Sequence, residues 1–173
     1  ARIRASGEDA QRNLDRNRDL EKRLTPLRMD VLLLQDYLEQ DVPVSEDMIF
    51  RFRTPAAAAE LHALAAVTKL KDAFPVTAGQ SPEQHEIFLL RVAYLVLGLV
   101  SLNGVKGPAE EAQRRLALGE TEFVTFIVKE ASKWLLKPRV LLEEICDQQN
   151  LFTIRTRNLL QHAGFLQSQL GKS

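Results

Sequence analysis

Residues 87–102 read IFLLRVAYLVLGLVSL, and this stretch decides the predicted fold. Almost every position in it is apolar, and it contains a single charge, Arg91, and a single glycine, Gly98. A helix that is apolar on every side is buried on every side. The sequence therefore predicts that this stretch is the core of a helical bundle.

The residues that precede this stretch carry a helix-start signal. Ser81 can serve as the N-cap, Pro82 occupies the first helical position, and Gln84 can reach back to complete a capping box. Asn103-Gly104 is typical of a helix end. We therefore predict a central buried helix over residues 82–102.

The central stretch is too short for a transmembrane helix. Its uninterrupted apolar run extends only from Val92 to Val100, whereas a helix that spans a bilayer needs about 20 apolar residues. We therefore expect no association with a membrane.

The composition is that of one globular domain. The chain has 173 residues, of which 45% are hydrophobic and 27% are charged, and its 23 basic residues balance 23 acidic ones. A neutral chain has no overall field that would attract nucleic acid or a membrane. A single cysteine, Cys146, excludes an internal disulfide bond and fits a reducing compartment, so we predict a cytoplasmic location. Because the chain begins at Ala1 rather than at methionine, we expect a fragment, a trimmed form or a processed form.

The remainder of the chain also shows helical patterns, separated by proline and glycine. Thr25-Pro26 and Thr54-Pro55 each combine a capping threonine with a proline, as at a helix start. We predict an all-α, single-domain bundle of about seven helices around the central helix, with long terminal helices. The predicted segments are a charged N-terminal helix or arm over 1–24, then a bundle domain over 25–173 with helices at 26–40, 55–73, 82–102, 108–118, 121–137 and 139–170.

Residues 48–53, MIFRFR, are the one segment that also has strand character, because they alternate loosely. We find no second strand in the sequence that could pair with them, so we predict a helical turn or irregular structure opened by Ser45-Glu46-Asp47. In the alanine-rich helix that follows, the predicted inward face consists of Leu61, Leu64, Val67 and Leu70.

Both terminal helices carry an apolar heptad seam. In the C-terminal helix the seam runs from Leu142 to Leu170 without a helix breaker, and its polar members are Gln149 and Thr156. One helix of about 33 residues and about 50 Å is favoured over two helices that meet near Asn150. Packing of the terminal helices on the central one would also produce this spacing. The polar members favour partner choice instead, so the predicted partner-binding residues are Leu20, Leu24, Leu27, Val31, Phe152, Leu159, Leu166 and Leu170.

A basic ridge on the 121–137 helix suggests a second function. Lys129, Lys133 and Lys137 lie on its polar face and Arg139 follows. Such a ridge can bind phosphate groups, although a solvated helix face would look the same. The candidate residues for an anion or a nucleic acid are Lys129, Lys133, Arg139, Arg155 and Arg157.

No pattern in the sequence predicts catalysis. The three histidines, His62, His85 and His162, are far apart and lack metal-ligand spacing, and Cys146 has no histidine near it in the sequence. We therefore predict no catalytic, cofactor-binding or metal-binding residues.

Arg91 is the least expected residue of the central helix, because an unpaired charge is costly to bury. It must reach solvent, pair with an acid on another helix, or meet a ligand, and a pocket beside it would be the place for an enzymatic site. Gln84, Arg91 and Gly98 are seven residues apart and share one face, which we interpret as a narrow exposed stripe.

The function predicted from the sequence is therefore a non-enzymatic protein–protein interaction module, such as an adaptor, an assembly subunit or a chaperone-like protein. It would bind a partner or oligomerise with itself through coiled-coil-like seams of the terminal helices. The alternative is a nucleic-acid-binding or nucleoprotein-like helical domain that uses the basic ridge.

Overall fold

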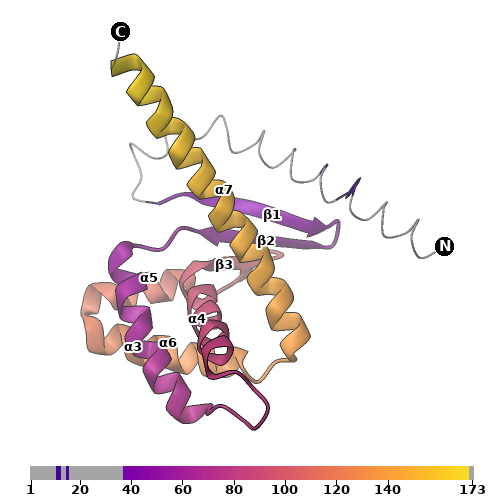
Figure 1. The fold of residues 1–173 in the computed structure, drawn as a ribbon, viewed down its shortest axis with the longest axis vertical. Helices are drawn as coiled ribbons and strands as arrows, with labels where there is room; N and C mark the ends of the chain where they lie inside the picture. Colours follow the sequence, from indigo (N-terminus) through magenta and orange to yellow (C-terminus); the bar gives the residue numbers. More distant parts are fainter. Residues whose placement is uncertain (1–10, 13–14, 16–36, 172–173) are drawn as a thin grey trace, which may run out of the picture. The chain divides into compact units, whose positions relative to one another are not determined.

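The computed structural model describes residues 11–12, 15 and 37–171, and for residues 160 and 162–171 it describes the backbone alone (Figure 1). The chain divides into two compact units. One is Glu39–Thr153, which contains a complete sheet and most of the helices. The other consists of Ala1–Leu38 together with Ile154–Ser173, and residues 11, 12 and 15 in it have helical backbone. The predicted helix over 26–40 lies largely outside the described residues.

The Glu39–Thr153 unit is a mixed α/β structure, so the all-α prediction is wrong. Its four strands form one antiparallel sheet in the order β1-β2-β3-β4. In the part of the chain that the structure describes from residue 37 onward, five helices accompany this sheet, rather than the seven predicted for the whole chain. The elements are β1 (Glu39–Ser45), β2 (Met48–Arg53), α3 (Ala57–Ala73), α4 (Pro82–Gly98), β3 (Leu99–Leu102), β4 (Val105–Lys106), α5 (Ala109–Leu118), α6 (Glu120–Trp134) and α7 (Arg139–Gly171).

The MIFRFR segment is strand β2, and its missing partner is β1. The partner was hidden because β1 contains Pro43, which had indicated a helix end. Proline is tolerated here because β1 is the edge strand of the sheet. Val42 of β1 pairs with Phe50 of β2 and both are buried, while Glu46-Asp47 form the hairpin turn instead of opening a helix.

The central helix is shorter than predicted, because α4 ends at Gly98 and the apolar run continues as β3. Hydrophobic pattern cannot separate these two states when both are buried. Asn103-Gly104 is the two-residue turn between β3 and β4, with φ values of 50° and 79°. Left-handed backbone at both central positions is the signature of a tight β-hairpin. The predicted serine cap and first-position proline of α4 are confirmed, since Ser81 accepts a hydrogen bond from the Gln84 N–H at 3.4 Å and the helix begins at Pro82.

The turn residue Asn103 also ties the two hairpins together. Its Oδ1 accepts a hydrogen bond from the Ile49 N–H at 2.7 Å, and its Nδ2 donates to the Asp47 carbonyl at 2.7 Å. Its own N–H donates to the Ile49 carbonyl at 2.9 Å. One side chain thus joins the β3–β4 turn to the start of β2.

We expect Asn103→Gly to lower the free energy of unfolding by about 1–2 kcal/mol, because it keeps the left-handed turn but removes both side-chain hydrogen bonds. Asn103→Ala should cost about 1 kcal/mol more, since alanine is also disfavoured at positive φ. Urea denaturation of both variants measures the two contributions. A glycine variant as stable as the wild type would show that the side chain does not join the hairpins.

Helices α3, α5 and α6 surround α4, and the sheet lies beyond the C-terminal end of α4 (Figure 1). The buried face of helix α3 consists mainly of alanines. Ala59, Ala63 and Ala66 are buried, together with Val67 and Leu70, which were predicted to face inward. The predicted inward positions Leu61 and Leu64 are instead exposed, because the small alanine face lets α3 approach its neighbours closely. The helix also begins at Ala57, two residues later than predicted.

The C-terminal half of the sequence folds largely as predicted. The face of α6 that contains Phe123, Ile127 and Ala131 is buried. Helix α7 is a single helix of 33 residues with no break at Asn150. At a rise of 1.5 Å per residue it is about 50 Å long.

Candidate functional site

The first half of α7 lies along the face of α4 that carries Arg91 and Gly98. Arg91 forms an ion pair with Asp147 of α7. A side chain at Gly98 would collide with the amide of Gln149. The stripe that we had interpreted as exposed is therefore largely the docking face for α7, which lies beside α4 in Figure 1.

The charge of Arg91 is satisfied by an acid on another helix, which is one of the three predicted alternatives. About a third of its side chain and more than half of that of Asp147 remain exposed. An ion pair at this exposure contributes only about 0–1 kcal/mol. It therefore helps to orient α7 more than it stabilises the fold.

The polar member of the C-terminal seam, Gln149, has a partner within the chain. Its Nε2 donates to the Tyr94 carbonyl of α4 at 2.6 Å. One turn further along, the ring of Phe152 stacks on Phe52 of β2 at 5.9 Å and is buried. Phe152, a predicted partner-binding residue, thus belongs to the core of the Glu39–Thr153 unit, and so do Leu142 and Ile145 of the same seam.

The remaining predicted partner-binding residues lie beyond this core. Leu159 is half-buried and Thr156 is buried, both in the part of α7 that belongs to the other unit. The backbone of α7 continues unbroken through the positions of Leu166 and Leu170. Their side chains, and Leu20, Leu24, Leu27 and Val31, lie outside the described residues.

The structure divides the predicted basic ridge. On α6, Lys129 is exposed, whereas Lys133 pairs with Glu130 at 3.1 Å. Arg139 pairs with Glu143 at 2.9 Å, and its guanidinium lies 4.2 Å from the ring centre of Phe88. In the other unit Arg157 is exposed and Arg155 is buried. The exposed Lys129, Lys133 and Arg139 therefore belong to the Glu39–Thr153 unit, whereas Arg155 and Arg157 belong to the other unit.

Cys146 lies on the inner face of α7 and is 3% exposed. Burial raises the pKa of its thiol to about 11, and the negative charges of Asp147 and Glu143 add to the increase, whereas Arg91 acts in the opposite direction. A nucleophilic cysteine needs a lowered pKa. The environment of Cys146 is therefore that of a structural residue.

This raised pKa predicts a loss of stability at alkaline pH. The folded state holds the thiol proton more tightly than the unfolded state, so the contribution is complete below pH 9 and is lost as the pH rises to about 11. Two pKa units correspond to about 2–3 kcal/mol. The fall in the free energy of unfolding between pH 9 and 11 should be smaller by about this amount in Cys146→Ala. Equal falls in both proteins would contradict the assignment.

Several large apolar side chains are exposed that the sequence had not indicated. Leu136 and Val140, on either side of Pro138, are both 81% exposed. Leu61 of α3 is 69% exposed and Ile87 of α4 is 57% exposed. Exposed apolar side chains that are scattered singly are normal on a protein surface, so these four do not by themselves define an interaction surface. Their exposure could not be predicted from the sequence, because an apolar residue in a helix is usually assigned to the buried face.

The histidines do not form a common site among the described side chains. The Nε2 of His85 lies 2.6 Å from the Phe74 carbonyl and donates to it, while its Nδ1 is buried without a hydrogen-bond partner. His62 lies 3.7 Å from Glu120 and contacts the edge of the Phe123 ring. Within the described residues, no group of three or more His, Cys, Asp or Glu side chains could hold a metal ion.

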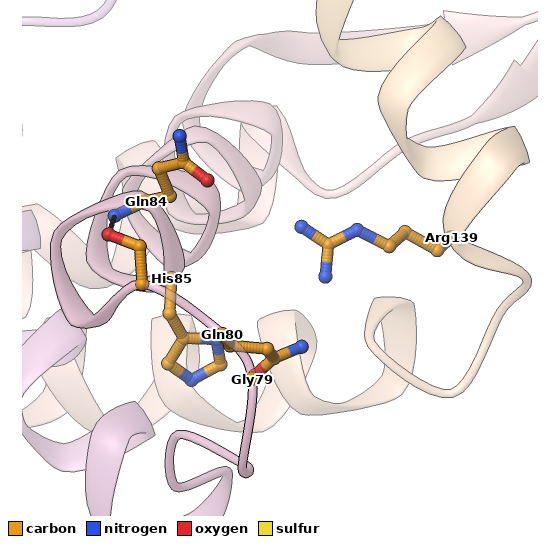
Figure 2. Close-up of a pocket in the computed structure, with 6 residues that line it drawn as sticks. Gly79, Gln80, Gln84, His85 and Arg139 are labelled. Carbon is orange, nitrogen blue, oxygen red and sulfur yellow. Dashed lines mark hydrogen bonds between the residues drawn. The ribbon is translucent and has the colours of Figure 1, made fainter.

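The start of α4 borders an open pocket of about 230 Å³ (Figure 2). Its wall is made by the loop before α4, the first turn of α4 and the first residue of α7. Arg139 was predicted as an anion-binding residue from the sequence, but nothing along the chain connects it with the start of α4. The lining residues are Gly79, Gln80, Ser81, Gln84, His85 and Arg139.

Comparison with protein-family models, with curated proteins and with solved structures finds no match to this chain. In the part of the chain that the structure describes, none of the helices combines the length and the apolar character needed to cross a membrane.

Proposed function

We propose that the chain is a non-enzymatic protein–protein interaction module, an adaptor, assembly subunit or chaperone-like protein, that binds a partner or a second copy of itself through the apolar seams of its terminal helices. The observation that supports this proposal is the continuation of α7. Helix α7 is continuous from Arg139 to Gly171, and its residues 154–171, 18 of its 33 residues, belong to the other compact unit rather than to Glu39–Thr153.

The seam continues in this part of the helix. Positions 159, 166 and 170 are leucines in the same register as Leu142 and Phe152. Helices in proteins gain most of their stability from packing an apolar face rather than from intrinsic propensity. A seam of this kind favours packing against another helix, and knobs-into-holes packing between two such seams would fix the register. A lone cysteine suits the proposed cytoplasmic location.

Sedimentation velocity across a concentration series tests this proposal. We expect the full chain to associate as its concentration rises, and Leu159→Lys with Leu166→Lys to shift it to the monomer, because a charge in the seam is costly to bury. The matched control is Leu61→Lys, the same substitution at an exposed leucine of α3. Association that survives the seam substitutions but is lost in the control would move the interface to α3, and a strict monomer would contradict self-association.

A further inference from the structure

We propose that the pocket at the start of α4 binds the phosphate group of a small phosphorylated molecule. Its lining residues carry hydrogen-bond donors from two separate segments, residues 79–85 and the start of α7, and none of them is a carboxylate. The site is independent of the terminal seams and adds a ligand to the proposed interaction function.

Arg139 supplies the principal donors. Glu143 accepts a hydrogen bond from its Nε at 2.9 Å, and the ring of Phe88 lies against the guanidinium. These two contacts hold the group in place, and no described residue accepts a hydrogen bond from its two terminal nitrogens. Figure 2 shows the guanidinium pointing from α7 across the pocket toward the first turn of α4. A guanidinium held in this way presents two parallel donors to an oxyanion.

Gln80 supplies a second donor from the loop. Its Oε1 accepts a hydrogen bond from the Thr77 N–H at 3.2 Å, which fixes the orientation of the amide and leaves its Nε2 for a ligand. In Figure 2 the amide nitrogen of Gln80 points toward the side of the pocket from which Arg139 enters. Because the two side chains come from different segments, their donors approach a bound group from different directions.

The start of α4 contributes a third element. Ser81 accepts the hydrogen bond from the Gln84 N–H, so its own hydroxyl proton can be donated to a ligand. The partial positive charge of a helix N-terminus adds to the attraction for an anion. A guanidinium together with amide and hydroxyl donors can satisfy the several oxygens of a phosphate group, whereas a carboxylate has only two oxygens. The volume of about 230 Å³ is below the range of about 300–1,000 Å³ that is usual for drug-sized ligands, so the molecule that carries the phosphate is small.

The test is a titration of the full chain with inorganic phosphate. Nitrogen–proton NMR spectra monitor binding through the side-chain amide signals of Gln80 and the Nε signal of Arg139. We expect saturable shifts at these signals and weaker binding of acetate. Arg139→Gln should weaken phosphate binding by at least about tenfold, because it removes a charged pair of donors. Gln80→Glu should abolish binding without disturbing the loop, since it keeps the acceptor for Thr77 and replaces the donor with a negative charge.

Two matched controls make the result decisive. Arg114→Gln removes the same charge from a mostly exposed position on α5, and Gln113→Glu places the same new charge elsewhere. Both should bind phosphate as the wild type does. Absence of saturable shifts, or equal losses in the pocket variants and the controls, would mean an adventitious ion only and would overturn the proposal. Sedimentation of Gln80→Glu should match the wild type, which keeps this test separate from that of self-association.

Discussion

Phe52→Ala should lower the free energy of unfolding by about 3–5 kcal/mol, the usual cost of removing a fully buried aromatic ring. Phe52 is 0% exposed. Its ring stacks on Phe50 at 5.7 Å and on Phe152 of α7 at 5.9 Å. Alanine would leave a cavity between the sheet and α7 and would remove two aromatic contacts at once. Urea denaturation measures the change.

The matched control for this substitution is Ile49→Ala in the same strand. Ile49 is 42% exposed, so its replacement should cost less than about 1 kcal/mol. The two variants should differ in stability because α7 covers the sheet at Phe52 but leaves Ile49 partly exposed. Equal losses in the two variants would show that Phe52 does not occupy this position.

Gly107→Ala should lower the free energy of unfolding by about 1–3 kcal/mol, because the site is already fully packed. The Gly107 N–H donates to the Val100 carbonyl at 2.7 Å and holds the chain against β3. A Cβ added at this glycine would collide with the backbone carbonyl oxygen of Leu99 and would lie 3.1 Å from the Leu99 Cγ. A backbone atom cannot move aside as the end of a side chain can.

The control for Gly107 is Val105→Ala in β4, two residues earlier. Val105 is 72% exposed, and its replacement should change the free energy of unfolding by less than about 0.5 kcal/mol. A Gly107 variant as stable as this control would mean that the chain after β4 does not pass so close to β3. Thermal unfolding followed by circular dichroism distinguishes the two outcomes.

Helix boundaries that carry local chemical signals were predicted well. Ser81-Pro82 starts α4, Pro138 precedes α7, and the absence of a breaker after Arg139 predicted one long helix. Each of these signals depends on the capping or backbone chemistry of a few neighbouring residues. Such signals can be recognised without knowledge of the tertiary structure.

The strands could not be predicted in the same way, because their evidence is not local. MIFRFR lacked a visible partner, since Pro43 in the pairing strand had indicated an end rather than an edge. Leu99–Leu102 were assigned to the central helix because a buried strand and a buried helix have equally apolar sequences. Asn103-Gly104 fits a helix end and a hairpin turn equally well. Only the hairpin interpretation would have revealed β3.

The candidate sites were predicted in part. Arg91 was identified as needing a partner, but the choice of Asp147 depends on how α7 lies on α4. Gln149 was identified as a polar seam residue, and its hydrogen bond to Tyr94 shows that this part of the seam is used within the chain. The pocket combines Gln80 with Arg139, which are far apart in sequence. No pattern along the chain could have placed these two residues together.

We propose that the C-terminal part of the α7 seam, at Leu166 and Leu170, binds another chain, and thiol reactivity tests this proposal most directly. The measurement is the rate at which iodoacetamide modifies Leu166→Cys in the full chain at increasing protein concentration. Ile154→Cys, at a position that is 44% exposed, gives the rate for an accessible thiol, and the buried Cys146 gives the rate for a protected one. We predict that Leu166→Cys reacts as fast as Ile154→Cys in dilute solution and becomes protected as the chains associate or when a partner binds. A rate as slow as that of Cys146 at every concentration would contradict the claim, because the seam would then be covered within its own chain.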